Sequence, residues 1–169
     1  LGVNLIYGAL HLHQEPKTLL MSLIDNLSTN RVEVDVVKFC GPAFEKVDNR
    51  LMSLELVSHG LSEAAMFTAD GEVVQASEVL YKKSILVERG NFRPVTRLTL
   101  DLLRCAREKF CQDQGLPPEE VVVLMEMTLR SLTTGQGAID HRDFLDRVDI
   151  LGALGQNVVI SNYARFFKL

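Results

Sequence analysis

The 169-residue chain contains no tryptophan and only three cysteines, and it carries no excess of positive charge. Because phenylalanine is the main aromatic residue, leucine, valine and isoleucine must build most of the core. Its 18 basic and 22 acidic side chains give a net charge of −4, which argues against a broadly basic surface for nucleic acids. No uncharged run is long enough to cross a bilayer, and no signal-peptide pattern is visible. We therefore expect a cytoplasmic globular protein without nucleic-acid or membrane partners.

The odd number of cysteines prevents complete pairing. Cys105 and Cys111 stand six residues apart, which is not the Cys-x-x-Cys spacing of many metal sites. Cys40 and the four scattered histidines do not change this. We expect reduced thiols, as in a reducing compartment, and no metal site.

The sequence begins without methionine and ends in the apolar stretch 165–169. We expect a fragment of a larger protein, with residues missing at both ends. Residues 1–80 are expected to form an N-terminal α/β segment and residues 81–169 a βαβαβ unit. If the two are not one domain, the boundary is expected near residues 76–83.

In the first part, helices are predicted over residues 16–27 and after Asp48 or Asn49, where either side chain can cap a helix. Residues 1–12 lack a clear period; a helix is favoured there over a strand. Residues 31–39 are β-branched and partly alternating, which predicts a strand. The pair Asp70-Gly71 between apolar segments predicts a hairpin with a type I′ turn.

In the second part, apolar runs at residues 84–88, 121–127 and 157–161 predict three strands. Amphipathic helices are predicted between them, over residues 96–110 and from Asp140 to Gly155. This alternation is typical of an α/β fold with a Rossmann-like, mainly parallel sheet, flanking helices and right-handed crossovers. The first of these helices is expected to turn five side chains inward: Leu98, Leu102, Leu103, Ala106 and Phe110.

The junction at residues 90–99 is the main candidate site. An apolar strand ends at Gly90, a short loop follows, and a helix begins, which is the arrangement that binds phosphates in many α/β proteins. Gly90 permits close approach of the backbone, Phe92 packs or stacks, and Arg93 pairs with phosphate. The candidate ligand-binding residues are Gly90, Asn91, Phe92, Arg93, Thr96 and Thr99.

The same segment resembles the first motif of the nicotinamide and nicotinate mononucleotide adenylyltransferases. Gly90, Phe92, Pro94 and Thr96 stand at matching positions, and the continuation over residues 100–106 is also similar. The resemblance implies a nucleotidyltransferase-like protein that binds a nucleotide or phosphorylated metabolite, with ATP and Mg²⁺ as cofactors for adenylyl transfer. The family's second motif histidine, which stabilises charge on the phosphates, is replaced by the neutral Thr99. Residues 160–165 resemble a later motif of that family but lack its threonine.

Two alternatives remain open at this junction. It can be an ordinary strand-to-helix turn, and the chain can be a catalytically inactive α/β domain with a regulatory or assembly role.

Glu126, near the carboxyl end of a central strand, is equally open to a structural or a functional interpretation. Asp140 and Asp143 suit the cap and the dipole of the helix that they open, which is favoured over the alternative that His141 and Asp143 form part of a site at the mouth of the sheet. Residues 67–71 resemble the haloacid-dehalogenase motif, but Thr68 stands where that family has its nucleophile, which favours the hairpin.

The chain as a whole is similar to an uncharacterised family of bacterial cytosolic proteins that are about twice as long. This resemblance implies a bacterial origin and a cytosolic fragment, and it adds no chemistry. The segments that carry it are residues 47–54, 78–83, 89–96 and 140–145.

Overall fold

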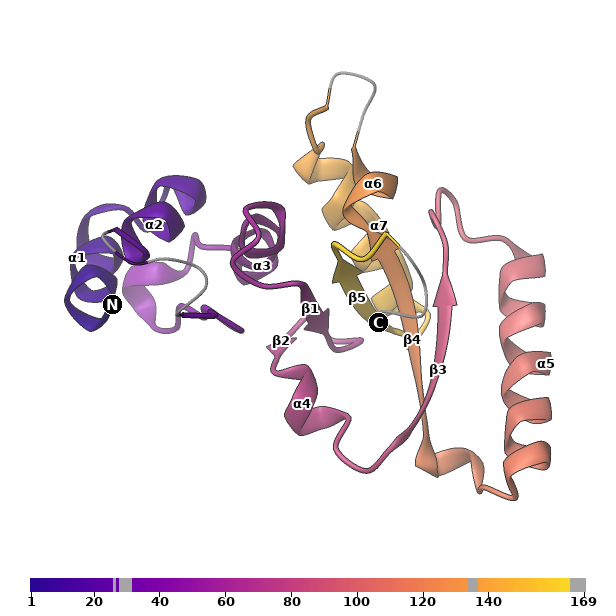
Figure 1. Cartoon of the computed structure of the whole chain (residues 1–169). Helices are drawn as coiled ribbons and strands as arrows, with labels where there is room; N and C mark the ends of the chain where they lie inside the picture. Colours follow the sequence, from indigo (N-terminus) through magenta and orange to yellow (C-terminus); the bar gives the residue numbers. More distant parts are fainter. Residues whose placement is uncertain (26, 28–31, 134–136, 165–169) are drawn as a thin grey trace.

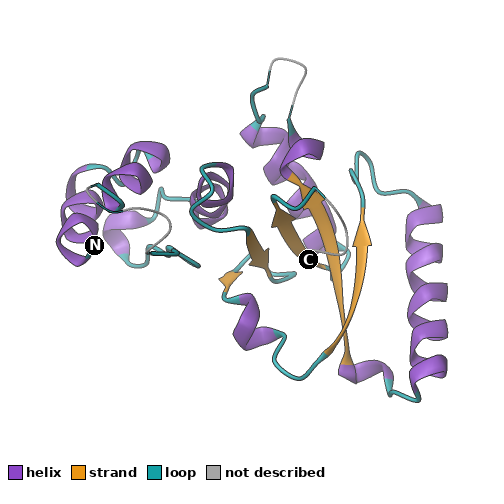
Figure 2. Ribbon diagram, viewed as in Figure 1, coloured by secondary structure: helices purple, strands orange, loops and turns teal. Residues whose placement is uncertain are grey.

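A computed structural model of the chain describes residues 1–25, 27, 32–133 and 137–164. It has an α/β fold with one five-stranded sheet in the order β2-β1-β5-β4-β3 (Figures 1 and 2). Strands β3 (Ser84–Arg89), β4 (Val121–Thr128) and β5 (Asn157–Ser161) are parallel neighbours. The predicted Rossmann-like sheet is therefore confirmed. It contains strands from both sides of the expected boundary at residues 76–83.

Strands β1 (Ala64–Phe67) and β2 (Val73–Val74) form the predicted hairpin and add antiparallel to β5. The predicted type I′ turn is wrong, because that turn needs positive φ at both central residues. Gly71 has a φ of 78°, whereas Asp70 is not among the described non-glycine residues with positive φ. Gly71 N–H donates to the Thr68 carbonyl and Thr68 N–H to the Glu72 carbonyl, both at 2.9 Å. The loop therefore has three residues, the last of them a left-handed glycine.

Helix α7 (His141–Ala153) connects β4 to β5, after the short α6 (Leu129–Leu132). The predicted cap is confirmed: the Asp140 carboxylate accepts from the backbone N–H groups of Arg142 and Asp143. Gly155, with a φ of 73°, follows the helix end as predicted. Three side chains of α7 are buried against the sheet: Phe144, Val148 and Leu151.

Helix α5 (Arg97–Gln114) connects β3 to β4 through the 3₁₀ turn η2 (Pro118–Glu120). It lies beside the edge strand β3 (Figure 1) and buries only Leu103 and Cys111. The predicted inward face is wrong for Leu98 and Leu102, which are 67% and 58% exposed, and Ala106 is also exposed. The apolar pattern shows which side chains of α5 could be buried. The single edge strand β3 is too narrow to bury all of them.

The N-terminal part is helical and packs against the face of α3 (Asn49–Ser58) that is turned away from the sheet (Figure 1). It comprises α1 (Gly2–His11), α2 (Pro16–Leu23) and η1 (Pro42–Phe44); α4 (Ala76–Val79) follows β2. The preference for a helix at the N-terminus is confirmed, and α2 ends before the predicted Leu27. Asp48 caps α3, as one of the two predicted alternatives. Helix α3 bridges two cores, with Met52 and Leu56 facing α2 and Leu54 and Val57 facing the sheet.

The strand predicted at residues 31–39 is wrong: residues 32–39 belong to no strand, and Arg31 lies outside the described residues. Val37 and Phe39 are instead buried against α2 and α3. The Asn49 side-chain amide replaces a neighbouring strand, since it accepts from Phe39 N–H at 2.8 Å and donates to Phe39 O at 3.0 Å. The β-branched pattern therefore packs an extended segment onto helices.

The two faces of the sheet are covered unequally. Met125, Met127, Val158 and Ile160 belong to the main core under α3, α5 and α7. The opposite face carries Leu124, Val159 and Met66, with Ala76 and Leu80 packed against them.

Among the described residues, no helix is long and apolar enough to cross a membrane.

Gly152 marks a close contact between α7 and the hairpin. A Cβ atom added there would lie 2.4 Å from the backbone oxygen of Ala69. We expect Gly152→Ala to lower the free energy of unfolding by about 1–3 kcal/mol, the usual cost of overpacking, although alanine favours helices. Chemical denaturation measures the change.

Gly2→Ala is the control, because nothing lies within 4 Å of a Cβ atom at that helical position. It should leave stability unchanged or raise it slightly. Equal stability of Gly152→Ala and wild type would show that the hairpin turn yields without cost.

Candidate functional site

The carboxyl ends of the three parallel strands form one edge of the sheet, where α/β proteins usually bind ligands. β3 ends at Arg89, β4 at Thr128 and β5 at Ser161. The loop at residues 90–96 leaves this edge and enters α5. The loop that carries the candidate residues therefore lies at this edge of the sheet.

Gly90 and Phe92 both stabilise the conformation of this loop. Gly90 N–H donates to the Glu126 carbonyl at 3.0 Å and so extends the β3–β4 ladder. A Cβ atom on Gly90 would lie 2.9 Å from the Phe92 ring, so only glycine leaves room for that ring. Phe92 has a φ of 48° and is 6% exposed, as part of the main core. Of the two roles considered for Phe92, the packing role accounts for its position.

The buried guanidinium of Arg147 holds the same loop through a backbone carbonyl. Arg147 of α7 is 4% exposed and donates from Nη1 to the carbonyl oxygens of Asn91 (3.0 Å) and Ser131 (3.3 Å). Its Nη2 donates to the Asp143 carboxylate, which also lies 3.2 Å from Arg93 Nε. Asn91 therefore contributes a backbone oxygen to the anchor of the loop, and Asp143 serves two arginines.

Arg93, Thr96 and Thr99 lie nearer to solvent. The Arg93 side chain is 66% exposed. Thr96 caps α5, since its Oγ1 accepts from Thr99 N–H at 3.2 Å. The two threonine hydroxyls lie 3.1 Å apart. The Thr99 hydroxyl thus lies against the hydroxyl that caps α5.

On the opposite face, Glu126 forms an ion pair that the sequence analysis missed. Its carboxylate is fully buried and accepts from Arg89 Nε and Nη2, both at 2.7 Å, and from Ser161 Oγ at 2.5 Å. The hydrogen bond to Glu126 raises the pKa of Arg89 above its usual value. Arg89 and Glu126 are register partners, so the occurrence of opposite charges at the ends of two adjacent strands was the available signal.

A hollow of about 260 Å³ lies beside this ion pair, at the carboxyl edge. Two arginines contribute to it, Arg89 and Arg130, together with Ser161, Asn162 and Tyr163. The last predicted motif residue, Arg165, lies outside the described residues.

Glu88 is a second acid that the sequence analysis did not single out. Its Oε2 is buried and has no hydrogen-bond partner among the described residues. Burial raises the pKa of this carboxyl. The folded state therefore favours the neutral acid, and its stability falls as pH rises from the unfolded value of 4.5 through the raised pKa.

The other polar candidates have local structural roles. Asp140 caps α7, and His141 Nε2 lies 3.0 Å from the Glu55 carboxylate on α3. Within the described ranges, no group of three or more metal-ligating side chains comes together. Cys40 and Cys105 are exposed free thiols, and Cys111 is a buried one.

Comparison with protein-family models, with curated proteins and with solved structures gives no significant match to this chain.

The buried ion pair makes a specific stability prediction. Glu126→Gln keeps the shape of the side chain but removes the charge that faces Arg89. We expect a loss of about 1.5–3 kcal/mol in the free energy of unfolding, the usual contribution of a hydrogen bond to a charged group. Urea denaturation at neutral pH measures it.

Asp113→Asn is the matched control, because Asp113 forms an exposed pair with Lys109 on α5. Its cost should stay within about 1 kcal/mol, as is typical of surface ion pairs. Equal costs for the two substitutions would contradict a structural role for the Glu126 pair.

Proposed function

We propose that this chain binds a nucleotide or another phosphorylated metabolite at residues 90–99. One observation carries the proposal: this loop leaves β3 at the carboxyl edge of three parallel strands and enters the 18-residue helix α5 through Thr96. Backbone N–H groups and the positive end of the helix dipole favour an anion at such a junction. The similarity of residues 90–96 to the first motif of the mononucleotide adenylyltransferases supports the same ligand class.

Arg93 can supply positive charge to the ligand, as can the exposed Arg97 at the start of α5. Arg93 is exposed, and its present partner is the Asp143 carboxylate, which Arg147 also holds. A phosphate oxygen could therefore take over Arg93 while Asp143 keeps one cation. Arginine–phosphate hydrogen bonds are charge-assisted and stronger than neutral ones.

Thr96 and Thr99 contribute less. Their hydroxyl oxygens lie within hydrogen-bonding distance of each other, so one hydroxyl hydrogen is used between them and one remains for a ligand. Gly90 and Phe92 support the loop from within the core and do not contact the ligand in this proposal.

The position of Thr99 favours binding without adenylyl transfer. The adenylyltransferase resemblance assigns charge stabilisation to a histidine at this position, and a neutral hydroxyl engaged in a helix cap cannot replace it. The second candidate function is thus a catalytically inactive domain that binds a nucleotide for a regulatory or assembly role.

Arg93→Gln tests the binding proposal. We expect it to weaken the binding of ATP or of nicotinamide mononucleotide by about ten- to hundredfold, which corresponds to one lost charged hydrogen bond. Isothermal titration calorimetry measures the affinity. Gly90→Val is unsuitable as a test, because its side chain would collide with Phe92 and disturb the core.

Lys109→Gln provides the comparison. Its side chain is 71% exposed and pairs with Asp113 farther along α5, so charge and exposure are close to those of Arg93. This variant should bind as wild type does. Absence of binding to any nucleotide, or equal losses in both variants, would reject the proposed site.

A turnover assay separates binding from transfer. We expect no pyrophosphate release from ATP with nicotinamide or nicotinate mononucleotide, either in wild type or in Thr99→His. The histidine variant restores the residue type at one position, while residues 160–165 still lack the later motif's threonine. Clear wild-type turnover would show that Thr99 is compatible with adenylyl transfer.

A further inference from the structure

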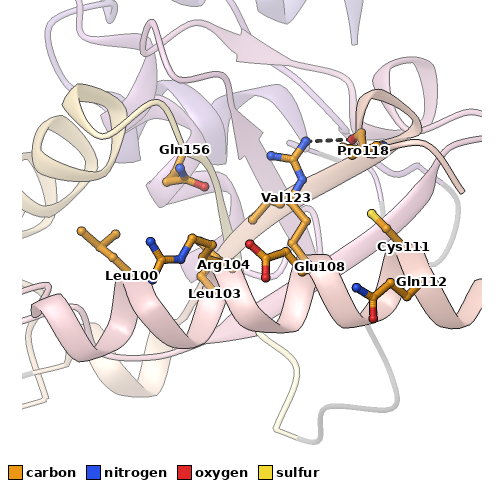
Figure 3. Close-up of a pocket in the computed structure, with 10 residues that line it drawn as sticks. Leu100, Leu103, Arg104, Glu108, Cys111, Gln112, Pro118, Val123 and Gln156 are labelled. Atoms are coloured by element: carbon orange, nitrogen blue, oxygen red, sulfur yellow. Dashed lines mark hydrogen bonds between the residues drawn. The ribbon is translucent and has the colours of Figure 1, made fainter.

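A cavity of about 530 Å³ lies between α5 and the sheet, toward the amino ends of β4 and β5 (Figure 3). Val123, the third residue of β4, and Gln156, just before β5, contribute from the sheet side. Pro118 of η2 closes one end. The volume is within the range of small-molecule pockets, about 300–1,000 Å³. On the helix side, the lining runs along α5 from Leu100, one turn after Thr96, to Gln112.

The inside of this cavity is mostly apolar. Leu100, Leu103 and Cys111 come from the inner side of α5, and Val123 faces them from β4. The space exists because α5 covers the edge strand and buries few of its own side chains. A ligand with an apolar body would remove this surface from water.

Two arginines, Arg104 and Arg107, lie about one helical turn apart at the rim, and Arg104 also pairs with Asp101 at 3.0 Å. Arg107 Nη2 donates to the Pro118 carbonyl at 2.8 Å, the bond drawn in Figure 3. Arg107 Nε is buried and has no acceptor among the described residues. A buried N–H without an acceptor is destabilising, and an anionic oxygen would satisfy it. Glu108 is the one acid at the rim, against these two cations.

We propose that this cavity binds an amphipathic anion, a molecule with an apolar chain and a carboxylate or similar anionic head. The apolar chain of the ligand would lie on Leu103 and Val123, and its anionic head would accept hydrogen bonds from Arg104 and Arg107. The apolar interior distinguishes this ligand class from the phosphorylated metabolite proposed for the carboxyl edge.

Octanoate is the probe, and two cysteines of α5 report where it binds. Cys111 lines the cavity, whereas Cys105 is exposed on the same helix and does not line it. Octanoate should slow the alkylation of Cys111 by iodoacetamide several-fold and leave Cys105 unaffected, as measured by peptide mass spectrometry. Equal protection of both thiols, or protection of neither, would overturn the proposal.

Charge reversal tests the head group. Arg104→Glu and Arg107→Glu should each weaken octanoate binding by about tenfold or more, since each removes a charged donor. Lys109→Glu is the control: Lys109 is equally exposed on α5 and lies outside the cavity. Because Arg104 is exposed, its substitution leaves the fold intact and the test valid even if Arg107→Glu unfolds.

The neutral alcohol 1-octanol separates apolar from anionic recognition. It should bind at least tenfold more weakly than octanoate in calorimetry. Equal binding of alcohol and acid, or loss of octanoate binding in Lys109→Glu to the same extent as in Arg104→Glu, would overturn the assignment of the head group to the two arginines.

Discussion

The buried guanidinium of Arg147 determines where the chain runs at the carboxyl edge of the sheet. It belongs to α7, yet its hydrogen bonds reach Asn91 in the loop after β3 and Ser131 in α6 after β4. Burying a charge is costly unless an opposite charge and hydrogen bonds accompany it, and Asp143 one turn earlier provides that charge. Removal of Asp143 would leave the buried Arg147 guanidinium without an opposite charge, whereas Asp143 also pairs with Arg93. The hydrogen bond from Arg147 to the Asn91 carbonyl therefore holds the backbone of the loop after β3 in place.

Sequence patterns predicted those elements whose determinants are local. The apolar runs of β4 and β5 follow from burial on both faces of the sheet, and Asp48 and Asp140 cap their helices through their own side chains. The failures depend on distant partners. Residues 32–39 have strand-like chemistry, but the Asn49 amide and the helices around Phe39 offered an alternative to a sheet. Leu98 and Leu102 belong to an apolar stripe that the narrow edge of the sheet cannot reach.

At the candidate site, the sequence predicted the strand–loop–helix junction but not the contacts of its side chains. A glycine between a strand and a helix sufficed to place residues 90–99 at the carboxyl edge. It could not show that Gly90 makes room for Phe92, because the ring folds back onto the glycine only in three dimensions. The pairing of Arg89 with Glu126 required the register of two strands that are 37 residues apart. Side chains that meet across the sheet are thus the part of a site that a single sequence conceals.

Helix α5 connects the two ends of the sheet, and its packing is uneven. At its first turn, Thr96 and the Phe92 loop hold it to a core that Arg147 stabilises. Along the rest of its length only Leu103 and Cys111 are buried, and the Arg107–Pro118 hydrogen bond is one of its few polar contacts with η2. Segments with little buried apolar surface open at lower free energy than the core. Helix α5 buries two of its 18 residues, whereas α7 buries four of 13, so we expect α5 to open more readily than α7. A molecule that fills the cavity would add packing against the two buried residues of α5, because Leu103 and Cys111 both line it.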